Sequence, residues 1–217
     1  MGGVLIIGVF ERLGFHLCKR LLDMGYEVGG ISLNPSPDET EEDMELEIGR
    51  NSNFEKMPIG AVETHFNRDK VVVFSLYDLY TEGKIPPSHT ESLGKKLEEL
   101  IRLNHHWPLV VLLLPNGLGQ RSGEEQNIKA IRKAADLAEA SAEKVLRVIL
   151  PVPGTPGKDL EQTGKKNTAK KARTLPTAGE EGPDWDKAAE CIALMIDKGD
   201  TGTRILEGIY PTLNGRG

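Results

Sequence analysis

Residues 4–34 read VLIIGVFERLGFHLCKRLLDMGYEVGGISLN, and this stretch carries more information about the fold than the rest of the chain. It opens with a short apolar run that ends at Gly8, and a second glycine, Gly14, follows six residues later. Leucines at helical spacing come next, and Gly25 separates them from a second apolar run. The order predicts a strand, a glycine-containing turn, a helix and a second strand.

The glycine turn is the first candidate binding site. Glycines at this spacing, between a strand and a helix, are typical of the turn that holds the pyrophosphate of a dinucleotide against helix amides. Such turns carry a third glycine in the middle, where this chain has Glu11. A carboxylate about 5 Å from a phosphate costs roughly 3 kcal/mol at an effective dielectric near 20, although Arg12 is a candidate phosphate partner that would offset it. Weak binding of NAD or NADP is therefore expected, with these cofactor-binding candidates: Gly8, Phe10, Glu11, Arg12, Leu13 and Gly14.

Strands and helices alternate through the rest of the chain. This alternation, with the glycine turn, predicts a single α/β domain over 1–217 with a doubly wound, mostly parallel sheet of the NAD(P)-binding Rossmann type. An acidic block at 38–48 is expected to be a solvated helix face or a flap, and residues 49–68 show no clear pattern. The predicted strands are 4–7, 26–33, 70–76, 108–115, 145–152 and 203–209, and the predicted helices are 13–24, 88–103, 124–139 and 184–198.

Composition limits the partners, the location and the metal sites that are expected, and it marks one segment as a loop. Residues 153–183 are rich in glycine, proline and lysine, which predicts a flexible loop or a lid within the domain. The net charge of −6 disfavours nucleic acid and anionic membranes as partners. No run approaches the roughly 20 apolar residues that a membrane span needs, and the start reads as a strand rather than a signal peptide, so a cytoplasmic location is expected. No cysteine–histidine cluster has zinc spacing, and no metal is expected.

Four segments together resemble the extended short-chain dehydrogenase/reductases, which are the NAD-dependent epimerase/dehydratase family. GVFERLGFHLCKRLLDMGYEV (8–28) is similar to that family's TGxxGxxGxxLxxxLLxxGxEV opening, and KVVVFSLYDLY (70–80) resembles its central strand. PLVVLLLPNGLGQ (108–120) and DWDKAAECIALMIDKG (184–199) resemble its later strand and helix. By this resemblance the chain looks like a shortened member with a reduced C-terminal substrate region, because the segment 35–68 is too short for the usual elements. It also looks degenerate, because Glu11 replaces the middle glycine.

The resemblance implies a catalytic set of Ser or Thr, Tyr and Lys, in which the tyrosine is the acid/base and the lysine lowers its pKa. In this chain Leu76 stands where the serine is expected, and Ser75, one residue early, is a further cofactor-binding candidate. The best register for the tyrosine–lysine helix puts Lys95 at the lysine position and Glu91 at the tyrosine position. Glu91 would serve as the acid if burial raised its pKa. A second pair, Tyr80 with Lys84, shares a face only on a helix, and the glycine and prolines that follow favour a loop.

Residues at the ends of the other strands complete the candidate site. Ser32 and Asn34 stand near the position where an acidic residue normally binds the ribose 2′-hydroxyl of NAD, and Asp38 comes too late in the sequence. The sequence at this position therefore contains no residue that decides between NAD and NADP. Ligands in open α/β sheets bind at the carboxyl ends of strands, which makes three residues after the strand 108–115 candidates for the substrate: Asn116, Gln120 and Arg121.

These observations leave several functions open. One is a nucleotide- or dinucleotide-binding relative of nucleotide-sugar epimerases and dehydratases that is catalytically impaired and acts as a sensor or partner protein. The second is a working NAD(P)-dependent epimerase, dehydratase or reductase, which would be an oxidoreductase or epimerase acting on a nucleotide-sugar-like substrate with Lys95 and a replaced acid. The third is a structural subunit with an empty cleft. The partner in the first two is a small nucleotide ligand. A homo-oligomer is left open, and a stable oligomer would favour the third.

Overall fold

The structure is a computed structural model that describes residues 2–34, 36–58, 71–82, 87–103, 107–116, 125–152 and 184–206. Seven strands in these ranges form one sheet in the order β3-β2-β1-β4-β5-β6-β7, and every neighbouring pair is parallel. The strands are β1 (Gly3–Ile7), β2 (Glu27–Ile31), β3 (Phe54–Lys56), β4 (Val71–Ser75), β5 (Leu109–Pro115), β6 (Val145–Leu150) and β7 (Gly202–Ile205). The doubly wound parallel sheet that the sequence predicts is therefore confirmed.

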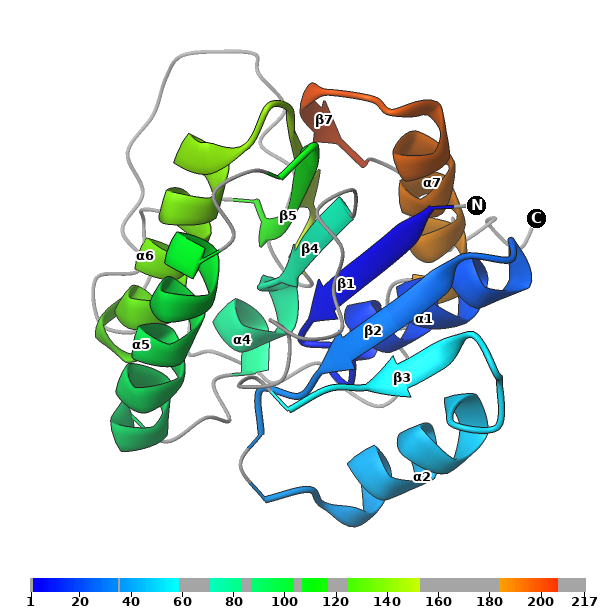
Figure 1. Ribbon diagram of the computed structural model, residues 1–217, viewed down its shortest axis with the longest axis horizontal. Helices are drawn as coiled ribbons and strands as arrows, with labels where there is room; N and C mark the ends of the chain where they lie inside the picture. Colours follow the sequence, from blue (N-terminus) through cyan, green and yellow to red (C-terminus); the bar gives the residue numbers. More distant parts are fainter. Residues whose placement is uncertain are drawn as a thin grey trace, which may run out of the picture.

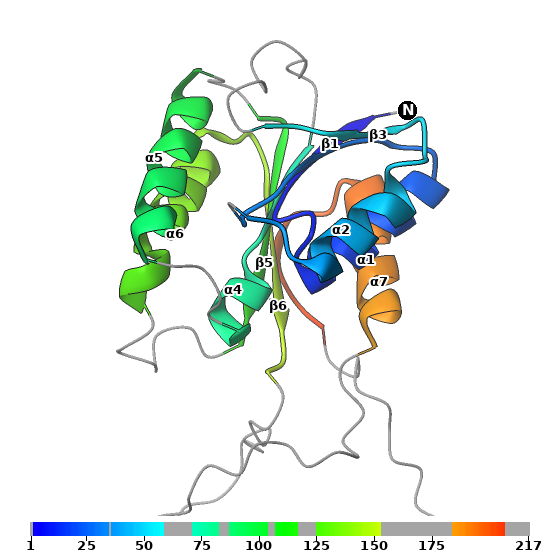
Figure 2. The same ribbon diagram turned by 90° about the horizontal axis from the view of Figure 1, so that it is seen from below.

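Helices cover both faces of the sheet. They are α1 (Arg12–Asp23), α2 (Glu39–Ile48), α4 (Tyr77–Glu82), α5 (Pro87–Leu103), α6 (Glu125–Ser141) and α7 (Trp185–Lys198). Figure 1 shows α5 and α6 side by side at one end of the view, and Figure 2 shows α1, α2 and α7 on the opposite side of the sheet from them. The topology places the carboxyl ends of all seven strands along one edge, where this class of sheet binds ligands.

The core consists of two clusters, one on each face of the sheet. Alternate residues of the central strands contribute to opposite clusters, so Val73 packs with α1 and α7 while Val72 and Phe74 pack with α5 and α6. This two-sided burial explains why β4 and β5 are continuous apolar runs rather than alternating ones. Helix α1 buries Leu13, Leu17 and Leu21, the leucines whose spacing predicted it.

Two elements were missed by the sequence analysis. Strand β3 lies inside the segment 49–68, where no pattern was found, and it forms a three-residue edge of the sheet beside β2. Helix α4 occupies residues for which a loop was favoured, and it ends at Glu82, before Gly83.

The acidic block forms α2, the helical one of the two alternatives; most of its residues are exposed, but Glu41 and Ile48 are buried. The loop or lid predicted at 153–183 lies outside the described residues. In the part of the chain that is described, no helix has the length and apolar character to cross a membrane.

Cys18 supplies a pH-dependent prediction. Its side chain is fully buried on α1, and burial raises the pKa of its thiol from 9.0 to about 12. Above pH 9 the unfolded chain releases this proton while the folded chain retains it, so the stability gained from the neutral thiol is complete below pH 9 and is lost as the pH rises toward 12. Urea unfolding should show a free energy that falls by about 1.4 kcal/mol per pH unit in that window because of Cys18. The Cys18→Ala variant should show a shallower slope, and an equal slope in both proteins would contradict this assignment.

Candidate functional site

The turn between β1 and α1 is fixed by Gly8, which has a φ of +89°. This conformation is strained for residues with a side chain, and a Cβ at Gly8 would lie 3.0 Å from the carbonyl oxygen of Ser75. The amides of Gly8 and Val9 both donate to the carbonyl oxygen of Ile31, at 2.9 and 3.2 Å. The turn is therefore attached to the end of β2, and the two segments form one continuous part of the carboxyl edge.

Gly14 allows α1 to approach this turn closely. A Cβ at Gly14 would lie only 2.0 Å from the carbonyl oxygen of Gly8 and 3.3 Å from the hydroxyl oxygen of Ser75. Close helix–strand packing is one of the tasks that glycine performs in a dinucleotide-binding turn. Both glycines that the sequence singled out thus have a steric reason to be there.

The middle of the turn differs from the glycine pattern. Phe10 is 9% exposed and packs edge to face on Phe54 of β3, with 6.5 Å between the ring centroids. Its side chain therefore belongs to the core and does not point into open space. Glu11 is the residue before α1, but its side chain makes no capping hydrogen bond to the helix amides. Arg12, the other charged residue of the turn, is exposed.

A buried carboxylate from α4 caps α1 in place of Glu11. The amide of Leu13 donates to Oδ2 of Asp78 at 3.0 Å, and Asp78 is 2% exposed. A carboxylate at the N-terminus of a helix is stabilised by the free amides and by the helix dipole. The sequence analysis did not single out Asp78, although its position just after a buried strand, at the carboxyl edge, was a usable signal.

A pocket of about 330 Å³ lies next to the turn, where β2 and β3 end against α5. This volume is at the small end of the range for ligand sites. Three segments supply its walls, so it brings together residues more than sixty positions apart in the sequence. The lining residues are Ile31, Ser32, Asn34, Lys56, Met57, Pro58, Ser92, Leu93 and Lys96.

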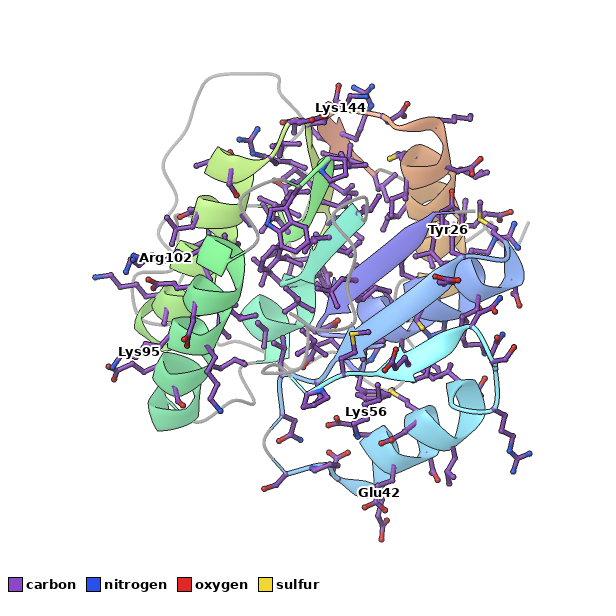
Figure 3. The ribbon with its side chains drawn as sticks, in the orientation of Figure 1. Tyr26, Glu42, Lys56, Lys95, Arg102 and Lys144 are labelled. Atoms are coloured by element: carbon purple, nitrogen blue, oxygen red, sulfur yellow. The ribbon has the colours of Figure 1, made fainter. Side chains whose placement is uncertain are left out.

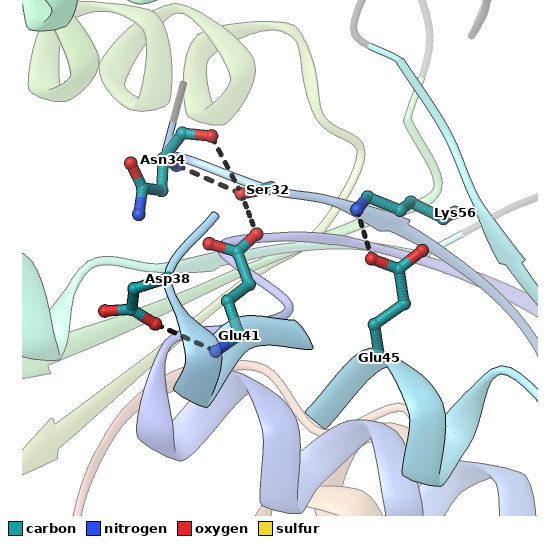
Figure 4. A network of polar contacts seen from close by, with 6 residues as sticks. All are labelled: Ser32, Asn34, Asp38, Glu41, Glu45 and Lys56. Carbon is teal, nitrogen blue, oxygen red and sulfur yellow. Dashed lines mark hydrogen bonds and ion pairs between the residues drawn. The ribbon is translucent and has the colours of Figure 1, made fainter. Parts of the chain in front are cut away.

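Ser32 and Asn34, which the sequence predicted as ligand-binding residues, both line this pocket. The hydroxyl of Ser32 donates to Oε1 of Glu41 at 2.5 Å and accepts the backbone amide of Asn34 at 3.0 Å (Figure 4). Glu41 comes from α2 and is 6% exposed. An acidic residue therefore does reach the end of β2, which the sequence analysis missed because Glu41 is far from β2 along the chain. The amide of Glu41 in turn donates to Asp38, which caps α2.

Two lysines give the pocket its positive charge. Lys56 forms an ion pair with Glu45 of α2 and lies 5.1 Å from the centroid of the Phe10 ring, a cation–π distance. Lys96 is exposed on α5, and it has no ion pair with any of the described residues. The carboxylates of α2 thus hold Ser32 and Lys56 in place, while Lys96 remains available to an anion.

The predicted catalytic pair lies elsewhere. Lys95 and Glu91 form an ion pair at 2.9 Å on the outer side of α5, with side chains 73% and 68% exposed. Figure 3 shows Lys95 pointing away from the sheet. The hydrogen bond with Lys95 lowers the pKa of Glu91, so the condition under which Glu91 would serve as the acid, a pKa raised by burial, is not met. The same hydrogen bond raises the pKa of Lys95. Neither side chain lines the pocket.

The remaining predicted residues divide between buried and undescribed positions. Ser75 is fully buried beneath the turn, and its hydroxyl oxygen has no hydrogen-bond partner among the described residues. Asn116 is exposed at the end of β5, and its amide donates to the carbonyl oxygen of Leu150. Gln120, Arg121 and the side chain of Tyr80 lie outside the described residues. Among the residues that are described, no three metal-binding side chains come together.

Comparison with known proteins supports the fold. No protein-family model matches the sequence, and no curated protein is similar to it. Among solved structures, AtPrR2 with NADP⁺ and (+)pinoresinol is 15% identical and has a TM-score of 0.58, covering 97% of this chain and 70% of its own. Gre2 of Candida albicans with NADPH is 14% identical, with a TM-score of 0.52 and coverage of 95% and 78%.

Other matches differ in length. The Lmo0794 protein of Listeria monocytogenes is 14% identical, with a TM-score of 0.51 over 94% of this chain and 99% of its own. The chain spans only 56% of the NAD⁺-bound WbmH enzyme of Bordetella bronchiseptica, which is 16% identical and has a TM-score of 0.46 over 70% of this chain. At these identities the likeness concerns the fold, and the expected Rossmann-type fold is confirmed. Two of the structures that share it hold NADP⁺ and NADPH.

Proposed function

We propose that this chain is a nucleotide-binding relative of the NAD(P)-dependent reductases and epimerases, impaired in catalysis, that acts as a sensor or partner protein. The observation that carries the proposal is the pocket between β2, β3 and α5, which combines two lysines with small polar side chains. Convergent polar groups in a concave site are the usual mark of a ligand site. The pocket adjoins the Gly8 turn through Ile31, whose carbonyl oxygen accepts the turn amides.

The charge of the pocket favours a nucleotide with a phosphate on its ribose. Lys56 and Lys96 line the pocket, and lysine is a common partner of phosphate. Glu41 would repel a phosphate or accept a ribose hydroxyl, but its carboxylate is bound to Ser32 and does not line the pocket. NADP(H) is therefore the proposed ligand in preference to NAD(H).

Impaired catalysis is supported by the positions of the predicted catalytic groups. A proton-transfer group must come within hydrogen-bond reach of the substrate. Lys95 and Glu91 lie on the solvent side of α5, and Ser75 is buried with its hydroxyl closed to ligands. Leu76 occupies the position at which the family resemblance implies a serine. Among the described residues, the catalytic arrangement of Ser or Thr, Tyr and Lys that the resemblance implies is therefore not found.

Ligand-dependent stabilisation tests the binding proposal. NADP at a concentration a hundredfold above its Kd should stabilise the full chain by about 2.7 kcal/mol, which thermal unfolding detects as a raised Tm. NAD should bind at least about tenfold more weakly, because it lacks the charged group that both lysines attract. Equal affinity for the two ligands, or tighter binding of NAD, would contradict the assigned roles of Lys56 and Lys96.

Turnover assays test the catalytic part separately. The chain should oxidise no NADPH in the presence of aldehydes, ketones or nucleotide sugars at a rate above that of buffer. A saturable rate that disappears in the Lys95→Ala variant would refute the impairment and support the alternative, an active NAD(P)-dependent epimerase, dehydratase or reductase.

A further inference from the structure

The Leu13 amide is the feature of this fold that the proposed nucleotide site leaves unexplained. In a strand–turn–helix unit the first amides of the helix are the groups offered to a phosphate. Here the amide of Leu13 already donates to the buried carboxylate of Asp78 at 3.0 Å. The chain thus supplies its own anion at the place where the diphosphate of a dinucleotide would be expected.

Asp78 is held there by its neighbours on both sides. Tyr77 is 1% exposed, donates its hydroxyl to the carbonyl oxygen of Pro151 at 2.7 Å and packs edge to face on Trp185. Leu79, on the other side, is 5% exposed and belongs to the core cluster beneath α5 and α6. Swinging the Asp78 carboxylate away would therefore require α4 to move within a packed core.

The two candidate phosphate sites at the carboxyl edge of the sheet, the mouth of α1 and the pocket beside β2, differ in charge. The mouth of α1 carries the carboxylates of Asp78 and Glu11 against one cation, Arg12. The pocket beside β2 carries Lys56, which is paired with Glu45, and Lys96, which has no ion pair with any described residue. Carboxylates repel phosphate and lysines attract it, so the pocket end, where Lys96 lies, is more favourable for an anion than the mouth of α1. The pocket volume of about 330 Å³ is at the small end of the range for ligand sites, which favours a ligand smaller than a whole dinucleotide.

We infer that the ligand recognised by this chain is a ribose-phosphorylated adenosine nucleotide, and that a diphosphate at the mouth of α1 contributes nothing to its affinity. This inference rests on the proposed nucleotide-binding function and narrows it. The phosphate on the ribose lies between Lys56 and Lys96. The Leu13 amide donates to Asp78 and therefore does not donate to a phosphate. A dinucleotide is then bound by its phosphorylated adenosine half alone.

Calorimetric titration of the full chain with two probes, NADP and adenosine 2′-phosphate, tests the inference. The two dissociation constants should agree within about threefold. An affinity for NADP at least tenfold higher would overturn the inference while leaving the proposed nucleotide binding intact. Binding of neither probe would overturn both. Preference for adenosine 5′-phosphate over the 2′-phosphate would also overturn the inference, since it would remove the ribose phosphate from the lysines.

The Asp78→Asn variant tests the assigned cause. Its amide oxygen still accepts the Leu13 amide but carries no charge, so NADP should bind about tenfold more tightly while adenosine 2′-phosphate changes by less than about twofold. An equal change for both probes, or no change for NADP, would overturn the role of Asp78. Asp136→Asn, on the exposed side of α6, alters the net charge equally and should leave both affinities unchanged. If Asp78→Asn fails to fold, the ratio of the two affinities in the unaltered chain decides the inference.

Discussion

Alanine at position 14 should destabilise the chain more than most other single methyl additions. The added Cβ would lie 2.0 Å from the carbonyl oxygen of Gly8 and 3.0 Å from its carbonyl carbon. Both are backbone atoms of a turn whose amides are fixed to Ile31, so neither can rotate aside as a flexible side chain would. Overpacking of this kind costs about 3 kcal/mol or more, and urea unfolding of Gly14→Ala should show a loss of that size.

Gly2→Ala is the matched control for this prediction. A Cβ at Gly2 would have its nearest neighbour at 3.6 Å, in the ring of Tyr26, which is an ordinary contact distance. The free energy of unfolding should therefore change by less than about 0.5 kcal/mol. A loss below 1 kcal/mol in Gly14→Ala would mean that α1 does not approach the turn as closely as the structure has it.

Lys96→Glu should lower the affinity for NADP by about a hundredfold. A hydrogen bond to a charged group is worth about 1.5–3 kcal/mol, and the substituted carboxylate adds repulsion to the loss. Lys96 is the stronger choice for this test than Lys56, because Glu45 already neutralises part of the charge on Lys56. The dissociation constant from calorimetric titration with NADP is the measurement.

Lys95→Glu is the control, because it makes the same change in net charge one residue away. Lys95 points to the outside of α5 and is paired with Glu91, so the affinity for NADP should change by less than about threefold. If the two variants lost affinity equally, the effect would be one of net charge and the pocket would not be the binding site. A larger loss in Lys95→Glu would contradict the account outright.

The fold was predictable because its signals are local. Buried parallel strands appear as continuous apolar runs, and the leucine spacing of α1 fixes both its position and its buried face. Strand β3 has only three residues, most of them exposed, so it contains no apolar run from which a strand could be predicted. Helix α4 has six residues, which is too short for a helical period to emerge.

The site was less predictable because distant segments build it. Ser32 meets Glu41, and Lys56 meets Glu45, only once α2 has packed beside β2 and β3. No spacing in the sequence encodes those contacts.

The position of Lys95, in contrast, could have been predicted from helical phase alone. Leu93, Leu97 and Ile101 point inward on α5 at intervals of four. A residue two positions from Leu93 is about 200° around the helix and must face outward. Alignment with the family's tyrosine–lysine motif placed Lys95 in the site, whereas the geometry of the helix places it outside.

A crystal structure of the chain soaked with NADP is the most direct test of the central claim, that the pocket between β2, β3 and α5 holds a phosphorylated adenosine. The account predicts density for the ribose phosphate at about 3 Å from the amino groups of Lys56 and Lys96, with Asp78 still bound to the amide of Leu13. Density for a diphosphate on the Leu13 amide, with the lysine pocket empty, would contradict it.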